Sequence, residues 1–229
     1  MYSGKISPGD AEILLKALGK AGLRQGMKVL EIGCAAGRMS RLIAERFCCE
    51  VTGVDTSRAA IEEAAGGPPP RNGSVRFLRE DAGNTGGRFP CAADNTKEPS
   101  PYDIVCSECT LSLIEGKREL FEKISAALVP GGKLVLLDMR VSKMEDAIRS
   151  AGFTKIYEED LSDELLSWAG QIIFDYGSLA AYFESVTPAG EDVAAYCGPF
   201  AGENPTGSGY AMSIFGNGPA EDSGSTAHG

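Results

Sequence analysis

Short apolar runs alternate with amphipathic segments along the first 160 residues of the chain. The apolar runs are rich in Val, Ile and Leu and lack strict alternation, which is typical of strands buried on both faces. The segments between them have the spacing of helices. The pattern predicts strands at 28–32, 50–54, 75–80, 102–107, 132–138 and 153–159, and helices at 8–23, 37–47, 57–65, 116–128 and 142–151.

The alternation stops beyond residue 160. Residues 160–186 have the pattern of two short helices with a break at Tyr176 and Gly177, and residues 189–209 look like loop. A last apolar run, YAMSIFG (210–216), predicts a strand that returns to the sheet. Because alternating strands and helices form parallel sheets covered on both faces, we expect an α/β fold. It is a Rossmann-like, doubly wound, mostly parallel seven-stranded sheet with a helical and loop cap inserted before the last strand.

These boundaries divide the chain into five segments. We expect an N-terminal helix in 1–27, a ligand-binding core at 28–160, a substrate cap at 161–208, the final core strand at 209–216 and a disordered tail at 217–229. Residues 82–101, rich in Gly, Pro, Asn and Asp, predict a long surface loop.

Composition narrows the possible partners. A formal net charge of −10 and a sequence pI near 4.7 disfavour nucleic acid, and no basic cluster offsets them. We find neither a signal-peptide pattern nor an apolar run long enough for a membrane span, so we expect a cytoplasmic protein that does not bind membranes. The seven cysteines are scattered without paired Cys-x-x-Cys motifs, which favours reduced thiols over a metal site. The sequence does not indicate an oligomeric state.

One stretch carries candidate ligand chemistry. Glu31 precedes the small-residue turn Gly33–Gly37, and Asp55 follows the next predicted strand. Small residues let the backbone approach a ligand, and an acid at a strand end can accept hydrogen bonds from ribose hydroxyls. Taken singly, either acid could equally cap a helix or be solvated. A nicotinamide cofactor would require Gly-x-Gly-x-x-Gly, which this turn lacks.

Five segments resemble class I S-adenosylmethionine-dependent methyltransferases in order and spacing, over about residues 8–159. They are VLEIGCAAG, GVDTS, FLREDA, YDIVCSECTLSL and LVPGGKLVLLD. The resemblance implies S-adenosylmethionine as the cofactor. It implies that Glu31 organises the turn facing the methionine moiety, that Asp55 holds the ribose, that Asp81 and Ala82 face the adenine, and that Ser107 lies beside the sulfonium. The full implied cofactor set is Glu31, Gly33, Cys34, Ala35, Gly37, Asp55, Thr56, Asp81, Ala82 and Ser107.

Ala35 departs from the family pattern, which has a glycine in the middle of the turn. Its methyl group narrows the approach to the ligand and adds strain if the backbone needs a positive φ.

The phrase SECTLSLI (107–114) resembles the arsenite methyltransferase branch, in which Cys109 matches a metalloid-binding cysteine. That resemblance makes Cys109 a candidate catalytic residue and Cys109 with Cys197 possible metalloid ligands. Cys91 is a further candidate. The alternative is that Cys109 is a small apolar residue packed near a strand end.

The sequence therefore predicts transfer of a methyl group to a small-molecule acceptor by in-line displacement, without naming the acceptor. The only histidine, His228, lies in the predicted tail, so any general base is a carboxylate or a tyrosine. Arsenite methylation and a non-catalytic accessory role remain alternatives. Aromatic residues in the cap pack in the core or line the pocket; they are Trp168, Tyr176, Tyr182 and Phe183.

Overall fold

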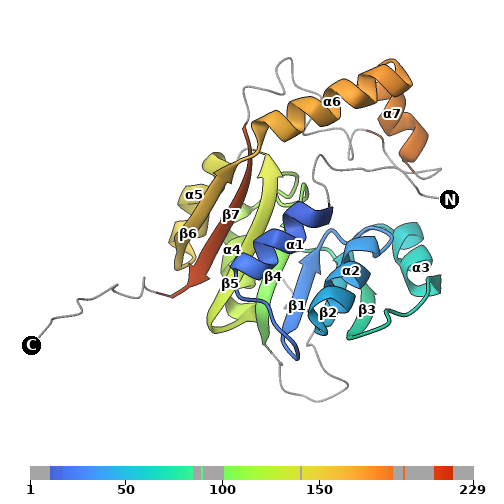
Figure 1. Cartoon of the computed structure of the whole chain (residues 1–229). Helices are drawn as coiled ribbons and strands as arrows, with labels where there is room; N and C mark the ends of the chain where they lie inside the picture. Colours follow the sequence, from blue (N-terminus) through green and yellow to red (C-terminus); the bar gives the residue numbers. More distant parts are fainter. Residues whose placement is uncertain are drawn as a thin grey trace, which may run out of the picture.

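The computed structural model describes residues 11–84, 89, 101–139, 141–187, 193 and 209–218. Within them the strands form one seven-stranded sheet in the order β3-β2-β1-β4-β5-β7-β6 (Figure 1). The strands are β1 Lys28–Ile32, β2 Glu50–Asp55, β3 Ser74–Arg79, β4 Tyr102–Glu108, β5 Leu128–Met139, β6 Phe153–Asp160 and β7 Tyr210–Asn217. The helices are α1 Ala11–Lys20, α2 Arg38–Phe47, α3 Arg58–Gly66, α4 Lys117–Ala127, α5 Val141–Ser150, α6 Ser162–Tyr176 and α7 Leu179–Val186.

The strand order reverses between β1 and β4. From β1 the chain steps outward to β2 and β3, then returns to place β4 on the other side of β1, with all these neighbours parallel. β7 enters antiparallel between β5 and β6. The predicted doubly wound, mostly parallel sheet is confirmed, and in such sheets the reversal point is where ligands bind.

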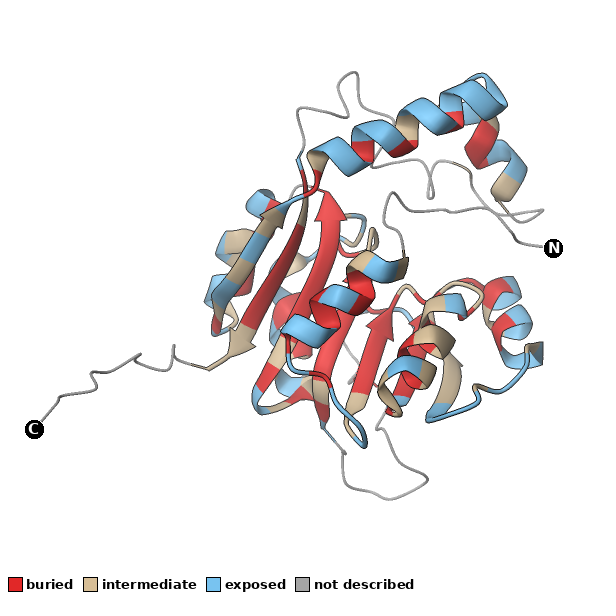
Figure 2. Cartoon of the chain, viewed as in Figure 1, coloured by how far each residue is buried: buried red, intermediate tan, exposed pale blue. Residues whose placement is uncertain are grey.

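Two apolar clusters cover the two faces of the sheet. One joins side chains of α1, α2, α6 and α7 to alternate residues of the strands, and the other joins α4 and α5 to the opposite residues. The central strands are buried almost throughout, as Figure 2 shows. Burial on both faces explains why their sequences lack strict alternation.

The predicted break in the last helical region is confirmed. Gly177, with a φ of 82°, ends α6, and the Ser178 hydroxyl accepts a hydrogen bond from the Ala181 N–H at 3.0 Å to start α7. Glycine adopts this left-handed conformation without the penalty of a Cβ, and serine is a favoured N-cap.

Three predicted boundaries were wrong. The helix predicted at 8–23 ends at Lys20, as α1. β5 starts at Leu128 rather than at 132, because Leu128 already pairs with Tyr102 before the register shifts. Asn217, placed at the start of the tail, is the last residue of β7. Its side chain exchanges hydrogen bonds with Ser125 at 3.0 Å, a contact across 92 residues that no local pattern indicates.

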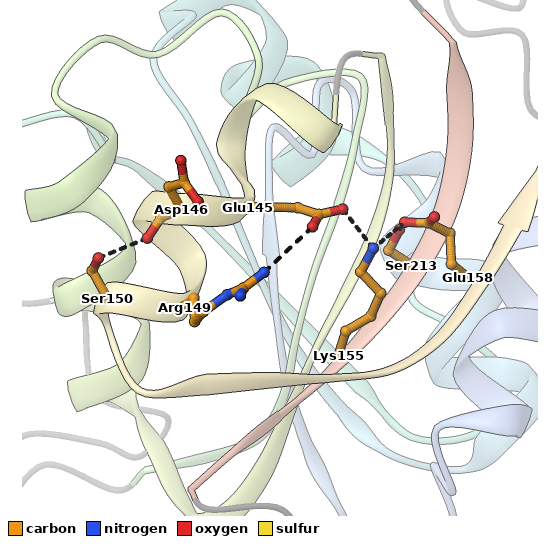
Figure 3. A network of polar contacts seen from close by, with 7 residues as sticks. All are labelled: Glu145, Asp146, Arg149, Ser150, Lys155, Glu158 and Ser213. Atoms are coloured by element: carbon orange, nitrogen blue, oxygen red, sulfur yellow. Dashed lines mark hydrogen bonds and ion pairs between the residues drawn. The ribbon is translucent and has the colours of Figure 1, made fainter.

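A polar network covers the outer edge of the sheet, where Lys155 of β6 lies between Glu145 of α5 and Glu158 (Figure 3). Ser213 of β7 donates to Glu158 at 3.2 Å. Exposed ion pairs contribute at most about 1 kcal/mol each. Charges on an edge strand discourage pairing with other chains, so we assign this network a structural role.

None of the helices within the described ranges is long and apolar enough to cross a membrane.

Candidate cofactor and acceptor site

Acidic residues gather at the carboxyl ends of the parallel strands. Glu31 lies near the end of β1, Asp55 ends β2, Glu108 ends β4 and Asp138 lies near the end of β5. These four strands are neighbours in the sheet, and Figure 1 shows α6 at the same end. The site therefore has one side at β1 and β2 and another at β4 and β5.

The turn after β1 is fixed by backbone hydrogen bonds. The N–H groups of Gly33 and Cys34 both donate to the Val54 carbonyl, at 2.9 and 3.1 Å. The Ala35 N–H donates to Asp55 Oδ2 at 2.9 Å. The turn predicted from the sequence is thus closed onto the end of β2.

Three positions of this turn have positive φ: Gly33 at 82°, Ala35 at 44° and Gly37 at 72°. A residue with a Cβ in this region costs about 1–2 kcal/mol, so Ala35 is strained as anticipated from its place in the turn. The hydrogen bond to Asp55 offsets part of that cost.

The Asp55 carboxylate organises both sides of the turn. Its Oδ1 accepts from the Ser57 N–H at 2.9 Å, while Oδ2 accepts from Ala35. Each oxygen keeps a further lone pair, and the side chain is only half-buried, so two hydroxyl donors can still bind. The donor set that a ribose presents fits this carboxylate.

Glu31 is a buried acid. It is 3% exposed, and the Ser40 hydroxyl of α2 donates to its Oε2. Burial, together with the charges of Glu108 and Asp55, raises its pKa to about 7 despite the Ser40 hydrogen bond. A cation bound beside Glu31 would favour its ionised form, which fits the positively charged amino and sulfonium groups of S-adenosylmethionine.

The loop after β4 packs against the turn after β1. A Cβ on Gly33 would overlap the side chain of Thr110. The same loop is tied to β5, because the Cys109 N–H donates to the Leu137 carbonyl at 2.8 Å and the Ser112 N–H donates to Asp138 Oδ2 at 3.0 Å. The loop thus connects the cofactor turn to the end of β5.

The end of β5 is a buried region close to two carboxyl groups. Asp138 is fully buried, and burial raises its pKa to about 6, although Ser112 and the Met139 N–H hydrogen-bond to it. Burial beside Asp138 and Glu108 raises the pKa of Cys109 well above its usual range. Burial raises the pKa of Tyr210 well above its usual range, and the neighbouring Cys109, Glu108 and Asp138 also raise it. Negative charge is therefore disfavoured at each of these groups.

Other predicted residues are engaged in structural contacts. The Ser107 hydroxyl is fully buried and donates to the Ile32 carbonyl at 2.9 Å, joining β4 to β1. Asp81 is exposed and accepts from the Gly83 N–H at 2.9 Å, which is turn chemistry. Thr56 is exposed, while Ala82 is buried against the cluster under α4.

Cys34 is buried, and burial beside Glu31 and Asp55 raises the pKa of its thiol. Cys91 and Cys197 lie outside the described residues, so their distance from Cys109 is not defined. Among the described residues no group of three or more His, Cys, Asp or Glu side chains is placed to hold a metal ion.

Five residues of this site were missed from the sequence: Ser40, Glu108, Thr110, Asp138 and Tyr210. Asp138 had a local signal, because it follows an apolar strand as Glu31 and Asp55 do. Glu108 had the same signal. Ser40 contacts Glu31 from the helix that directly follows β1. Thr110 and Tyr210 reach the site through contacts between elements distant in sequence, for which the local pattern offers no sign.

The aromatic residues of α6 and α7 pack mainly on one another. Trp168 lies 6.0 Å from Tyr182 between ring centroids, and Tyr182 lies 5.4 Å from Phe183. Trp168, Tyr182 and Phe183 belong to the apolar cluster that contains Tyr210. Of the two possibilities, core packing holds for these three, whereas Tyr176 is 45% exposed.

Residues 9–172 match the family model described as a methyltransferase domain. This chain belongs to the methyltransferase domain family. The predicted resemblance to class I S-adenosylmethionine-dependent methyltransferases is confirmed, and so is S-adenosylmethionine as the cofactor of the family. A structural neighbour is Haemonchus contortus phosphoethanolamine N-methyltransferase 2 in complex with S-adenosyl-L-methionine, with a TM-score of 0.64 and 21% identity over 95% of this chain and 54% of that one.

Relatives of this methyltransferase domain are named after several different substrates. Phosphoethanolamine N-methyltransferase 1 of Arabidopsis thaliana is 30% identical over 71% of this chain and 36% of its own length. Trans-aconitate 2-methyltransferase of Streptomyces avermitilis is 31% identical over 48% and 38%. Arsenite methyltransferase of Mus musculus is 25% identical over 52% and 32%. The chain spans about a third of the length of each of these relatives.

A groove of about 540 Å³ lies at the opposite end of the sheet, lined by the segment after α1 and the start of β5. Two of its charged side chains are partnered: Lys133 Nζ donates to the Ala21 carbonyl at 2.9 Å, and Asp103 accepts from the Lys28 N–H at 2.7 Å. We assign it no role in methyl transfer.

Gly33→Ala should lower the free energy of unfolding by about 2–5 kcal/mol, because it combines left-handed strain with overlap on Thr110. Gly131→Ala is the matched control, with a φ of 76° and no atom near the added Cβ, and should cost only about 1–2 kcal/mol. Urea denaturation of both variants measures the difference. Equal losses would show that the Thr110 contact does not constrain the turn.

Proposed function

We propose that this chain transfers the methyl group of S-adenosylmethionine to a small-molecule acceptor by in-line displacement. The observation that carries the proposal is the turn at Gly33–Gly37, closed by Asp55 beside the buried Glu31 at the reversal point of the sheet. Phosphoethanolamine, trans-aconitate and arsenite, the compounds in the relatives' names, are all small but differ in net charge.

The chain's own residues have four tasks in this proposal. Asp55 binds the ribose hydroxyls, and Glu31 balances the positive charge of the cofactor. The first turn of α2, which lacks a side-chain cap, offers N–H groups to the cofactor carboxylate. Asp81 and Ala82 bind at the adenine. When bound, S-adenosylmethionine supplies a methyl group activated by the sulfonium, so the protein mainly positions the acceptor.

The acceptor in this proposal binds between the end of β4 and the segment 161–208, which acts as a cap. A proton on the acceptor atom would leave to a carboxylate, and Glu108 and Asp138 are the nearest candidates at the ends of β4 and β5. The cytoplasmic location also stays a prediction. The five described cysteines are all free thiols, in agreement with a reducing compartment.

Two measurements test the proposal. Calorimetric titration of the reduced chain with S-adenosylhomocysteine should give saturable one-to-one binding, and a panel of amines, thiols, carboxylates and arsenite should yield a methylated product. Absence of binding would overturn the cofactor assignment. Binding without turnover on the full panel would favour the non-catalytic accessory role, which the strained Ala35 also motivates.

Arsenite methylation is a second candidate, supported by the position of Cys109 directly after β4. The raised pKa of this thiol opposes the thiolate that a metalloid needs, since burial and two carboxylates favour the protonated form. If arsenite is the acceptor, Cys109→Ser should abolish arsenite-dependent methyl transfer while binding of S-adenosylhomocysteine stays unchanged. Unchanged arsenite turnover in this variant would remove the candidate.

A further inference from the structure

The Arg41 side chain of α2 joins two segments on the β1 and β2 side of the site. Its Nη1 donates to the carbonyls of Ala36 and Gly37, the last two residues of the turn after β1, at 3.2 and 3.0 Å. Its Nη2 donates to the Ala64 carbonyl in the last turn of α3, and its Nε donates to the Pro68 carbonyl at 2.7 Å. One half-buried guanidinium thus connects the turn to the end of α3.

The space around this guanidinium is closely filled. Its central carbon lies 4.9 Å from the centroid of the Phe77 ring of β3, in a cation–π contact. A Cβ on Gly37 would overlap Phe77 and Nη1, and a Cβ on Gly67 would overlap Nη2. α3 has no basic residue in its own last turn, so Arg41 supplies the cation that the carbonyl end of a helix favours.

The segment that Arg41 fixes faces one end of the cofactor in our proposed function. Gly37, with a φ of 72°, is the N-cap of α2 and brings no side-chain cap. The N–H groups of that first helical turn are the ones that we assigned to the cofactor carboxylate. The ribose and adenine are assigned to Asp55, Asp81 and Ala82, to which Arg41 makes no hydrogen bond within the described structure.

We propose that Arg41 is a positioning residue for the amino acid end of S-adenosylmethionine. By binding the carbonyls of Ala36 and Gly37, it fixes the direction of the first N–H groups of α2, and it acts through this backbone instead of through a contact with the cofactor. The inference rests on the proposed function, because it uses the place given there to the cofactor carboxylate. Loss of the guanidinium should therefore weaken binding of that end of the cofactor and spare the adenosine end.

Two ligands separate the ends of the cofactor. S-adenosylhomocysteine has both ends, whereas 5′-methylthioadenosine has the adenine, ribose and sulfur but no amino acid. In calorimetric titrations of the full chain, Arg41→Ala should weaken binding of S-adenosylhomocysteine about tenfold or more and binding of methylthioadenosine less than about threefold. Arg46→Ala removes an exposed cation from the last turn of the same helix and should change neither affinity.

Gly67→Ala displaces the guanidinium while Arg41 and the turn keep their sequence. Alanine fits the extended backbone there, with φ −76° and ψ 166°, and the atoms nearest to the added Cβ all belong to the flexible end of Arg41. This variant should also weaken S-adenosylhomocysteine, and combining it with Arg41→Ala should add no further loss. Gly66→Ala is the matched control, because no atom lies within 4 Å of its added Cβ, and it should bind both ligands as the wild type does.

Arg41→Lys keeps the charge without the planar fork of donors, so it should recover little of the affinity lost in Arg41→Ala. Full recovery in this variant or equal weakening of both ligands in Arg41→Ala would overturn the inference. So would wild-type affinity for S-adenosylhomocysteine in both Arg41→Ala and Gly67→Ala. In each of these cases the wild type still binds and the proposed function stands. If the wild type itself fails to bind S-adenosylhomocysteine, the proposed function is overturned, and this inference with it.

Discussion

Asp55→Ala should weaken binding of S-adenosylhomocysteine about a hundredfold or more. The variant removes a carboxylate that we expect to accept two ribose hydroxyls, and hydrogen bonds to charged groups contribute about 1.5–3 kcal/mol each. It also releases the N–H groups of Ala35 and Ser57, which Asp55 holds at 2.9 Å, so the turn loses its side-chain attachment to the end of β2. Calorimetric titration at matched temperature and salt measures the loss.

Two variants separate binding from folding. Glu50→Gln changes an exposed acid at the amino end of the same strand and should leave the affinity unchanged. Asp55→Asn keeps one acceptor oxygen and should give an intermediate affinity. If Asp55→Ala binds as tightly as the wild type while its unfolding midpoint is preserved, the ribose is not held at the end of β2.

Glu31→Gln should remove most of the dependence of stability on pH between about 4.5 and 7. The ordinary pKa of a glutamate is 4.5, and burial raises that of Glu31 to about 7 in the folded chain. Between these values the folded chain binds the proton more tightly than the unfolded chain does. The free energy of unfolding of the ligand-free wild type therefore falls as the pH rises through this window. Glu31 should contribute about 3 kcal/mol to this fall.

The glutamine can still accept the Ser40 hydrogen bond but does not ionise. Its stability relative to the wild type should increase with pH and level off above pH 7, as measured by urea denaturation at pH 4.5, 6 and 7.5. Asp138→Asn is the matched control. Burial raises the pKa of Asp138 from 3.8 to about 6, so this variant should change the pH dependence of stability in the window between pH 3.8 and 6. Parallel pH profiles of Glu31→Gln and the wild type would contradict the burial argument.

Ionisation of Glu31 should also be coupled to binding of the cofactor. S-adenosylmethionine is positively charged beside this carboxyl in our proposal, so binding should favour the ionised form and release a proton below pH 7. The affinity of the wild type for the cofactor should then rise from pH 5 to 7, whereas that of Glu31→Gln should stay flat.

Several features of the fold followed from local pattern alone. Strands β1 to β4 and β6, and helices α2 to α5, lie within two residues of their predicted bounds, because an apolar run or a 3.6-residue repeat is complete within each element. The long start of β5 and the last residue of β7 were missed. Both depend on pairing with strands distant in sequence, Leu128 with Tyr102 and Asn217 with Phe153.

What the sequence by itself determined is the kind of sheet, the small-residue turn and the acids that follow its strands. Tertiary structure alone decided which of these groups meet. Thr110 rests against Gly33, Ser40 binds Glu31, and Tyr210 faces Cys109 across about a hundred residues. Periodicity reports only how one element is buried, whereas the protonation of Glu31 depends on which groups the fold brings around it.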